Sequence, residues 1–234
     1  MSKKKNIKSV QADLGQIVAL IIPTNHISEK EEIEYGLFEY IRNADFSTAV
    51  VIGHLTGQET GRISLYNGDT FPIQDVHLPI NTELLDELCD EEDDFFAEDI
   101  GHTQNPAIIR MVGSLLGVRE TVEVLPIILG SNRLSIAEEL GHALGEVMHN
   151  RHLLLISAIE IEKVAQATLG AFIGSLETMQ LNPLIRMVQS GEVKLKGGNA
   201  SFIGTLLAAS RRGVKQAKVL TTANNQFMGA ILYR

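Results

Sequence analysis

The stretch VEVLPIILGSNRLSIAEELGHALGEVMHNRHLLLIS, residues 122–157, decides the fold class. Short apolar runs open and close it, at 122–129 and 152–157, and the residues between them have the pattern of an amphipathic helix. Strands that alternate with helices are typical of an α/β protein with a largely parallel sheet. Ser135, with Glu138 three residues later, forms a capping box, which predicts a helix over 136–149.

The same alternation extends along the rest of the chain. Helices are predicted over 30–42 and over 202–212, and Asn67-Gly68 predicts a hairpin within 61–75. We find no internal repeat and no linker, and therefore expect one α/β domain over 1–234, with a central mixed, mostly parallel sheet and helices on both faces. Four further apolar runs predict strands: 16–22, 48–53, 217–221 and 227–233.

The composition is that of a globular protein. Of the 234 residues, 44% are hydrophobic and 21% are charged, and no uninterrupted apolar run approaches 18 residues, so a membrane-spanning protein is excluded. The single cysteine, Cys89, excludes a disulfide framework. The basic N-terminal segment 1–14 leads into an apolar run of only six residues, which indicates a strand rather than a signal peptide. We therefore expect a cytoplasmic protein with no membrane partner.

The net charge of −9 comes from one segment. Residues 86–99 hold nine acids and no Lys or Arg, and we predict that they form an exposed acidic insertion loop. Because Lys and Arg do not cluster in the sequence and aromatic residues make up only 5%, we expect no nucleic-acid partner. The neutral, apolar remainder of the chain is compatible with a homo-oligomer.

The candidate site residues are histidines placed at strand ends. His26 and His54 follow the first two predicted strands, and His102 follows the acidic segment. Loops at the carboxyl ends of strands converge in open α/β sheets, and three imidazoles there would suit a transition metal. Each histidine taken alone is more often structural. Gly197-Gly198 precedes a helix, where it would cradle an anion or serve only as a turn.

Several segments occur in the order found in one known family. The family is MEMO, also called AmmeMemoRadiSam system protein B, and its fold is related to that of class III extradiol (LigB-type) dioxygenases. The chain resembles this family from about residue 16 to 232. The resemblance is carried by Ile21-Ile22-Pro23-Thr24, Val51-Ile52-Gly53-His54-Leu55-Thr56, Gly101-His102-Thr103, Val124-Leu125-Pro126-Ile127-Ile128-Leu129-Gly130 and Thr222-Ala223-Asn224-Asn225.

The polar positions of the family motifs are mostly replaced. The two loop histidines of the family fall on Thr24 and Thr56, while His26 and His54 lie two positions away, about 6.5–7 Å along an extended chain. A family aspartate falls on Ile159, a further histidine on Glu162 and a cysteine on Asn199, and only His102 is kept. The resemblance therefore implies a LigB/MEMO-like fold without the family's set of metal ligands.

We expect a non-catalytic protein that binds a small molecule or a protein partner in a pocket at the strand ends, with no metal cofactor. The alternative is a dioxygenase-like or redox enzyme that holds iron or copper with His26, His54 and His102. The residues predicted to line the pocket are Thr24, His26, His54, Thr56, His102, Glu160, Glu162, Asn199 and Asn225.

Overall fold

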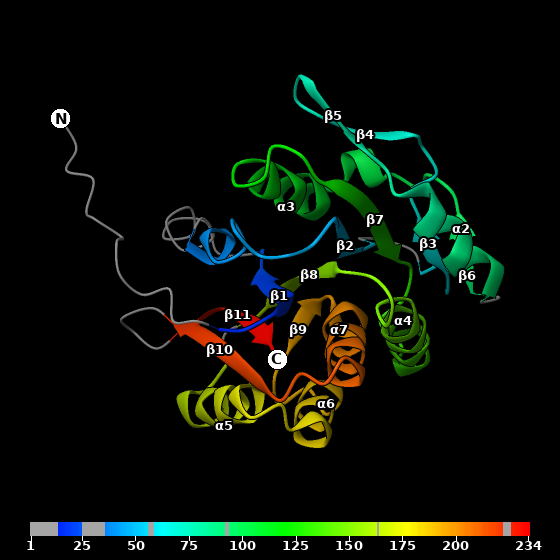
Figure 1. Cartoon of the computed structure of the whole chain (residues 1–234). Coiled ribbons are helices and arrows are strands. Elements are labelled where there is room, and N and C mark those ends of the chain that lie inside the picture. Colours follow the sequence, from blue (N-terminus) through cyan, green and yellow to red (C-terminus); the bar gives the residue numbers. More distant parts are fainter. Residues whose placement is uncertain (1–13, 25–35, 56–58, 92–93, 163, 222–225) are drawn as a thin grey trace.

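A mixed β-sheet runs through the middle of the protein (Figure 1). The computed structural model describes residues 14–24, 36–55, 59–91, 94–162, 164–221 and 226–234. Within these ranges nine strands form the sheet. Its order is β10 (Gln216–Thr221), β11 (Phe227–Tyr233), β1 (Ile17–Pro23), β8 (Leu153–Ile161), β2 (Thr48–His54), β7 (Glu123–Leu129), β3 (Ile63–Leu65) and β6 (Phe95–Ala97), and β9 (Leu195–Gly197) pairs with β8 outside this path.

The centre of the sheet is parallel and its flanks are mostly antiparallel. β1, β8, β2 and β7 run parallel to one another, so that Val51 lies between Ile156 and Pro126. Every residue of β1 and of β2 is buried, as expected for strands that are covered on both faces. β11 pairs antiparallel with β1 and β10, and β3 pairs antiparallel with β7. The predicted mixed, mostly parallel sheet is therefore confirmed.

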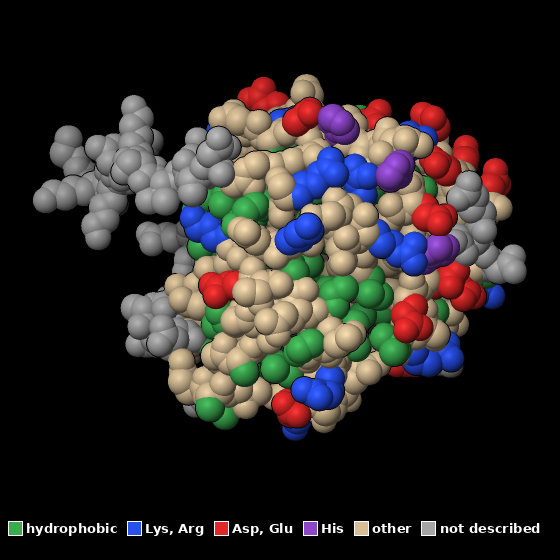
Figure 2. Space-filling model, turned by 60° about the horizontal axis from the view of Figure 1, so that its bottom comes forward, with side chains coloured by type: hydrophobic (Ala, Val, Ile, Leu, Met, Phe, Trp, Pro, Cys, Tyr) green, Lys and Arg blue, Asp and Glu red, His purple; other side chains and the backbone are tan. Residues whose placement is uncertain are grey.

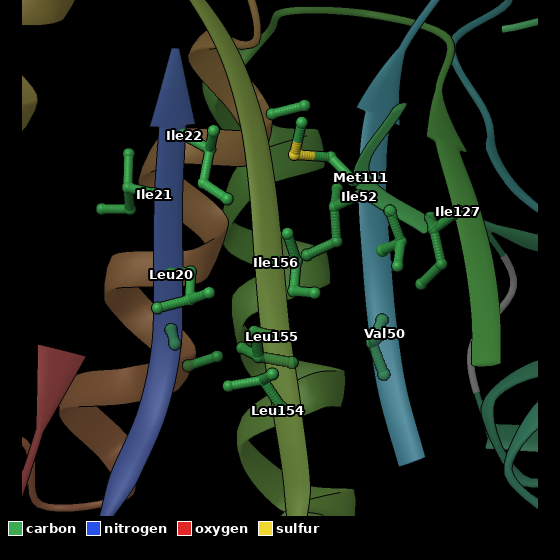
Figure 3. Close-up of a cluster of buried hydrophobic side chains, with 14 of the residues drawn as sticks. Leu20, Ile21, Ile22, Val50, Ile52, Met111, Ile127, Leu154, Leu155 and Ile156 are labelled. Carbon is green, nitrogen blue, oxygen red and sulfur yellow. The ribbon is translucent and has the colours of Figure 1, made fainter. Parts of the chain in front are cut away.

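Helices cover both faces of the sheet, as predicted (Figure 1). α3 (Pro106–Leu116) lies on one side, and α4 (Leu134–Val147) and α7 (Asn199–Arg211) pack together on the other. Figure 3 shows the aliphatic side chains of β1, β8 and β2 that form the core with Met111 of α3. The remaining helices are α5 (Gln166–Glu177) and α6 (Leu181–Gln189), which pack against each other, and α2 (Thr82–Glu91).

All six predicted strands are present, but the predicted helix starts are wrong. α4 begins one residue before Ser135, and its N-cap, Arg133, makes no side-chain capping bond, so the expected capping box does not form. α7 begins at Asn199 rather than Phe202 and ends before Gly213, whose φ of 81° is the left-handed backbone typical of a helix end. The predicted helix over 30–42 lies largely outside the described residues.

The predicted hairpin exists, but its turn is not at Asn67-Gly68. β4 (Thr70–Ile73) pairs antiparallel with β5 (Val76–Pro79), and the turn lies between them, where Gln74 has a φ of 51°. Gly68 serves close packing instead, because a Cβ there would lie 2.6 Å from the hydroxyl of Tyr66. The turn motif therefore indicated the right region and the wrong residues.

The predicted acidic insertion loop over 86–99 is wrong for most of the described residues of this segment, because 86–91 belong to α2 and 95–97 to β6. The apolar residues of the segment fix it to the body: Leu88 and Phe95 are buried in the core. Glu98 accepts a hydrogen bond from Ser64 Oγ at 2.7 Å, and Asp99 accepts two backbone N–H bonds, from Gly101 and His102. The predicted exposure is confirmed for part of the segment, at Asp86, Asp90, Asp94 and Asp99.

No helix in the described part of the chain combines the length and the apolar character needed to cross a lipid bilayer.

Candidate functional site

A pocket of about 240 Å³ opens at the carboxyl ends of three central strands, β2, β7 and β8. This is where an open α/β sheet places its ligands, because the loops that leave neighbouring parallel strands separate there. In the sequence, α4 begins shortly after the end of β7, and α7 begins shortly after the end of β9. The residues that line the pocket are His54, Leu55, Glu59, Leu129, Gly130, Ser131, Asn132, Glu160 and Lys196.

His54, the last residue of β2, is the most deeply buried ionisable group in the pocket. Only 6% of the residue is exposed, and its backbone oxygen accepts a hydrogen bond from Asn105 Nδ2 at 3.0 Å. Its Nε2 lies 3.8 Å from Glu160 Oε1, which is longer than a hydrogen bond. Its Nδ1 is buried and has no hydrogen-bond partner within the described residues. A buried imidazole therefore lines the pocket with unmet hydrogen-bonding capacity.

Gly197 makes room for this imidazole. A Cβ at position 197 would lie 2.0 Å from His54 Nε2, a distance at which two heavy atoms cannot coexist. Gly197 pairs with Glu160 in the register of β8 and β9, so one short strand pair sets the position of both the imidazole and the carboxylate. The glycine is needed for close approach, and any side chain there would displace the ring of His54.

Burial keeps the imidazole uncharged. Desolvation lowers the pKa of His54 below its ordinary value, and the negative charge of Glu160 opposes this shift only in part. At neutral pH His54 is therefore a neutral ring that offers one N–H donor and one nitrogen acceptor. Such a ring can bind a neutral or cationic ligand without the cost of burying a second charge.

A hydrogen-bonded loop forms the opposite wall of the pocket. Ser131 Oγ donates to Glu59 Oε2 at 3.0 Å and accepts from the backbone N–H of Arg133 at 3.3 Å and from its Nε at 3.2 Å. A Cβ at Gly130 would lie 1.8 Å from Thr60 Oγ1, so the loop packs tightly against the segment that carries Glu59. These contacts orient one carboxylate at the rim, while Lys196 brings one ammonium group.

His102 lies outside this pocket and is held by structural hydrogen bonds. The residue is fully buried, its Nε2 lies 2.9 Å from the backbone oxygen of Ser64, and its Nδ1 lies 3.4 Å from Asp99 Oδ1. Because a carbonyl oxygen only accepts, Nε2 carries the proton that it donates to Ser64. Burial also lowers the pKa of His102. The ring of His102 therefore has a structural role, because its hydrogen bond to Ser64 links the 102–104 turn to β3.

The other predicted site residues divide into two groups. Thr24, Glu162 and Asn199 are described but do not line the pocket: Thr24 donates its N–H and its hydroxyl to the oxygen of Ile159, at 2.7 and 3.1 Å, and the N–H of Glu162 donates to the oxygen of Lys194. Asn199 Oδ1 is buried without a partner in the described part of the chain. His26, Thr56 and Asn225 lie outside the described residues. Of the nine predicted residues, the structure brings together His54 and Glu160.

Sequence reasoning missed Glu59, Ser131, Asn132 and Lys196. Ser131 and Asn132 directly follow β7, so the rule that loops at the carboxyl ends of strands carry ligands could have found them. Lys196 belongs to a strand of three residues, which is too short to leave a periodic pattern.

The described residues do not fit a transition-metal site. Among them no group of three or more His, Cys, Asp or Glu side chains is placed to hold a metal ion. His54 and Glu160 would supply two ligands, and His102 Nε2 is already bonded to Ser64. A catalytic iron or copper centre needs about three protein ligands and an open position, and the described residues of the pocket supply two at most.

Comparison with known proteins bears on the fold. No protein-family model and no curated protein sequence matches the chain. The crystal structure of uncharacterized protein JW3007 from Escherichia coli K12 is similar, with a TM-score of 0.57 and 12% sequence identity, over 94% of this chain and 100% of that chain. At this identity the likeness concerns the fold alone, and it shows that the same α/β architecture exists in another protein.

The two buried histidines should make the stability of the protein sensitive to mild acid. Their pKa values are lowered in the folded state, whereas the unfolded chain takes up protons near pH 6.5. Stability should be complete above pH 6.5 and fall below it, toward the folded pKa values, by at most about 1.4 kcal/mol per pH unit for each histidine. Urea unfolding between pH 7.5 and 5 measures this slope.

The control for this prediction is an exposed histidine. His152 is 58% exposed and pairs with Asp45 at 2.8 Å. We expect the free energy of unfolding of the His54→Gln variant to fall less steeply below pH 6.5, because one buried imidazole is gone. In the His152→Gln variant both buried imidazoles remain, so their contribution to this pH dependence should be unchanged. An unchanged slope in the His54 variant would show that its burial does not control the titration.

Proposed function

We propose that this protein binds a small polar molecule in the pocket at the carboxyl ends of β2, β7 and β8. The observation that carries the proposal is His54, a neutral imidazole that is nine-tenths buried, lines the pocket and has an unpartnered nitrogen. A buried polar atom without a partner costs about 1–3 kcal/mol, and a ligand that bonds to it recovers that free energy. The fold supports the location, since strand ends are where such sheets hold ligands.

The size and charge of the pocket indicate the ligand's chemistry. A volume of about 240 Å³ has room for a compact molecule of several non-hydrogen atoms. Glu59 and Glu160 provide two carboxylates against the single ammonium of Lys196, while His54 is neutral. This balance favours a compact molecule with hydrogen-bond donors, such as an amine or a polyol, over an anion.

We propose binding without catalysis, in a divergent protein of MEMO type. The α/β fold agrees with what the resemblance implied, and the replacement of family motif positions by Thr24, Thr56, Ile159, Glu162 and Asn199 supports the loss of metal chemistry. The alternative, an iron or copper enzyme that uses His26, His54 and His102, would need His102 to leave its bond with Ser64.

Histidine-detected NMR tests the proposal. Protein carrying ¹³C-labelled histidine is screened with small amines, polyols and carboxylates. The ring signals of His54 should shift when a compound binds. The ring signals of His152 should not shift, because His152 directly precedes the first residue of β8 and the pocket lies at the last residues of that strand. His54→Gln and Glu160→Gln should each weaken binding at least about tenfold, because each removes a hydrogen bond worth 1.5–3 kcal/mol in a buried or charged setting.

The matched controls are His152→Gln and Asp45→Asn, which alter an exposed histidine–carboxylate pair and should leave affinity unchanged. Binding that persists in both His54→Gln and Glu160→Gln would refute this site. Elemental analysis of the purified protein addresses the alternative: about one iron or copper per chain, lost in His54→Gln and in His102→Gln, would establish a metal enzyme instead.

A further inference from the structure

Three arginines lie at the ends of α7 and β11, and we name Arg211, Arg212 and Arg234 the arginine cluster. Arg211 and Arg212 end α7, and Arg234 follows β11. Two histidines from α4 and the residues after it, His142 and His149, lie against them. Figure 2 shows the face of the molecule that carries α4 to α7, where Lys and Arg side chains gather with His side chains beside them. On a chain with a net charge of −9, this is a local concentration of positive charge.

Each guanidinium of the α7 pair faces an imidazole. Arg211 Nη1 donates to His142 Nδ1, whose other ring nitrogen lies 3.4 Å from Glu146 Oε1. Arg212 Nη1 lies 3.5 Å from His149 Nδ1. Within the part of the chain that the structure describes, no member of the arginine cluster is paired directly with a carboxylate. The positive charges of the cluster are therefore not neutralised by direct ion pairs.

Arg234 is held in place close to Arg212. Its Nε donates to Gln16 Oε1 at 2.7 Å, and its Nη1 donates to the backbone oxygen of Arg212 at 3.1 Å. Burial and the positive charge of Arg234 lower the pKa of Arg212 below the ordinary value for arginine. Two like charges held together by fixed hydrogen bonds repel each other, and an anion between them would relieve that repulsion.

Helix ends explain part of this arrangement. A cation at the C-terminus of α7 is stabilised by the helix dipole. That effect falls off within the last turn of α7 and does not require Arg234, which comes from a different element 22 residues further along the chain. The helix dipole therefore does not explain why Arg234 lies beside Arg212.

We propose that the arginine cluster is a binding site for a small phosphate-bearing anion with at least two negative charges. Guanidinium groups present planar pairs of N–H donors that match phosphate oxygens, and Arg is preferred over Lys wherever this bidentate geometry matters. The site is independent of the His54 pocket, which carries the opposite charge balance. The two proposals can therefore fail separately.

Titration with inorganic pyrophosphate tests the site, with backbone NMR on the full chain as the readout. Signals of 209–215 and of Arg234 should shift, and the shifts should shrink as salt is raised, because screening weakens contacts between exposed charges. Arg211→Gln with Arg212→Gln should weaken binding at least about tenfold, since each substitution removes a charged donor of a charge-assisted hydrogen bond to the anion. Arg62→Gln removes one exposed charge at the opposite edge of the sheet and should leave the affinity unchanged.

Three results would overturn the proposal. The first is that pyrophosphate shifts the signals no more than chloride does at equal ionic strength. The second is that the shifts persist in the Arg211→Gln, Arg212→Gln variant. The third is that the protein binds only to vesicles that contain an anionic phospholipid. Arg211→Lys with Arg212→Lys guards against loss of folding, because it keeps both charges at the helix end. This variant should fold as the parent does and bind more weakly than the parent, but more tightly than the glutamine variant.

Discussion

Replacement of Gly141 by alanine is expected to lower the free energy of unfolding by about 3 kcal/mol. Gly141 lies where α4 crosses α7, and a Cβ there would lie 2.6 Å from Leu207 Cβ and 3.1 Å from the backbone oxygen of Gly204. Neither neighbour can yield cheaply, since one atom is at the root of a side chain and the other is backbone. The two helices would have to move apart, and the packing of α7 on the sheet would loosen with them.

A second glycine in a helix provides the matched control. Gly174 of α5 has nothing within 4 Å of the Cβ position, so alanine there meets open space. Gly174→Ala should raise the free energy of unfolding by about 0.4–1 kcal/mol, because alanine restricts the unfolded chain and favours the helix. Urea unfolding measures both variants. A Gly141→Ala variant that is as stable as Gly174→Ala would show that α4 and α7 do not cross this closely.

Gly197→Ala is expected to abolish binding in the His54 pocket, with at least a hundredfold loss of affinity for any compound that binds the parent protein. The new Cβ would lie 2.0 Å from His54 Nε2, too close for two non-bonded atoms, so the imidazole must leave its place beside Glu160. A loss of this size corresponds to about 2.8 kcal/mol, which equals the loss of one to two good hydrogen bonds. The ring signals of His54 in the absence of ligand should also shift.

The control for this variant is Gly113→Ala in α3, where a Cβ would meet only Ile73 Cδ1, at 3.9 Å. This substitution should leave the His54 signals and the affinity unchanged. Since β9 has three residues and pairs only at the end of β8, Gly197→Ala should keep the far-ultraviolet circular dichroism of the parent. A Gly197→Ala variant that binds as tightly as the parent would mean that the imidazole does not contact the ligand.

The strands could be predicted because burial on both faces leaves a continuous apolar run. β1, β2, β7 and β8 each have this signature, and their predicted bounds were correct to within one residue at the start. The short elements could not be predicted in this way. β3, β6 and β9 have three residues each, and their place in the sheet depends on neighbours that are distant in sequence.

The helix starts and turns failed for a related reason. Ser135 has the sequence of an N-cap, yet tertiary packing starts α4 one residue earlier, and the local capping bond is lost. The prediction of a loop over 86–99 rested on the charge of the segment and not on the spacing of its apolar residues. The apolar positions Leu88 and Phe95 were sufficient to bury one helix face and one strand residue, while most of the acids that are described remain at the surface.

Part of the candidate site could be predicted from the sequence. His54 could be predicted from its place after a strand, and Glu160 from the same rule at β8. His102 has an equivalent position in sequence but a different role, because the hydrogen bond to Ser64 and the contact with Asp99 can be seen only in three dimensions. A sequence does not distinguish a histidine that binds a metal from a histidine with a structural role. Only the orientation of the ring in the folded protein distinguishes them.

The pairing of β1 with β11 constrains how the chain can fold during synthesis. The backbone N–H of Gln16 donates to Arg234, and that of Arg234 donates back to Gln16, so contacts at this edge close a loop of more than two hundred residues. β1 cannot acquire its first parallel neighbour before β8 has left the ribosome, nor its second neighbour before β11 has. Until then the apolar strand β1 has no partner along either edge, and pairing across so long a stretch of chain favours slow completion of this part of the sheet.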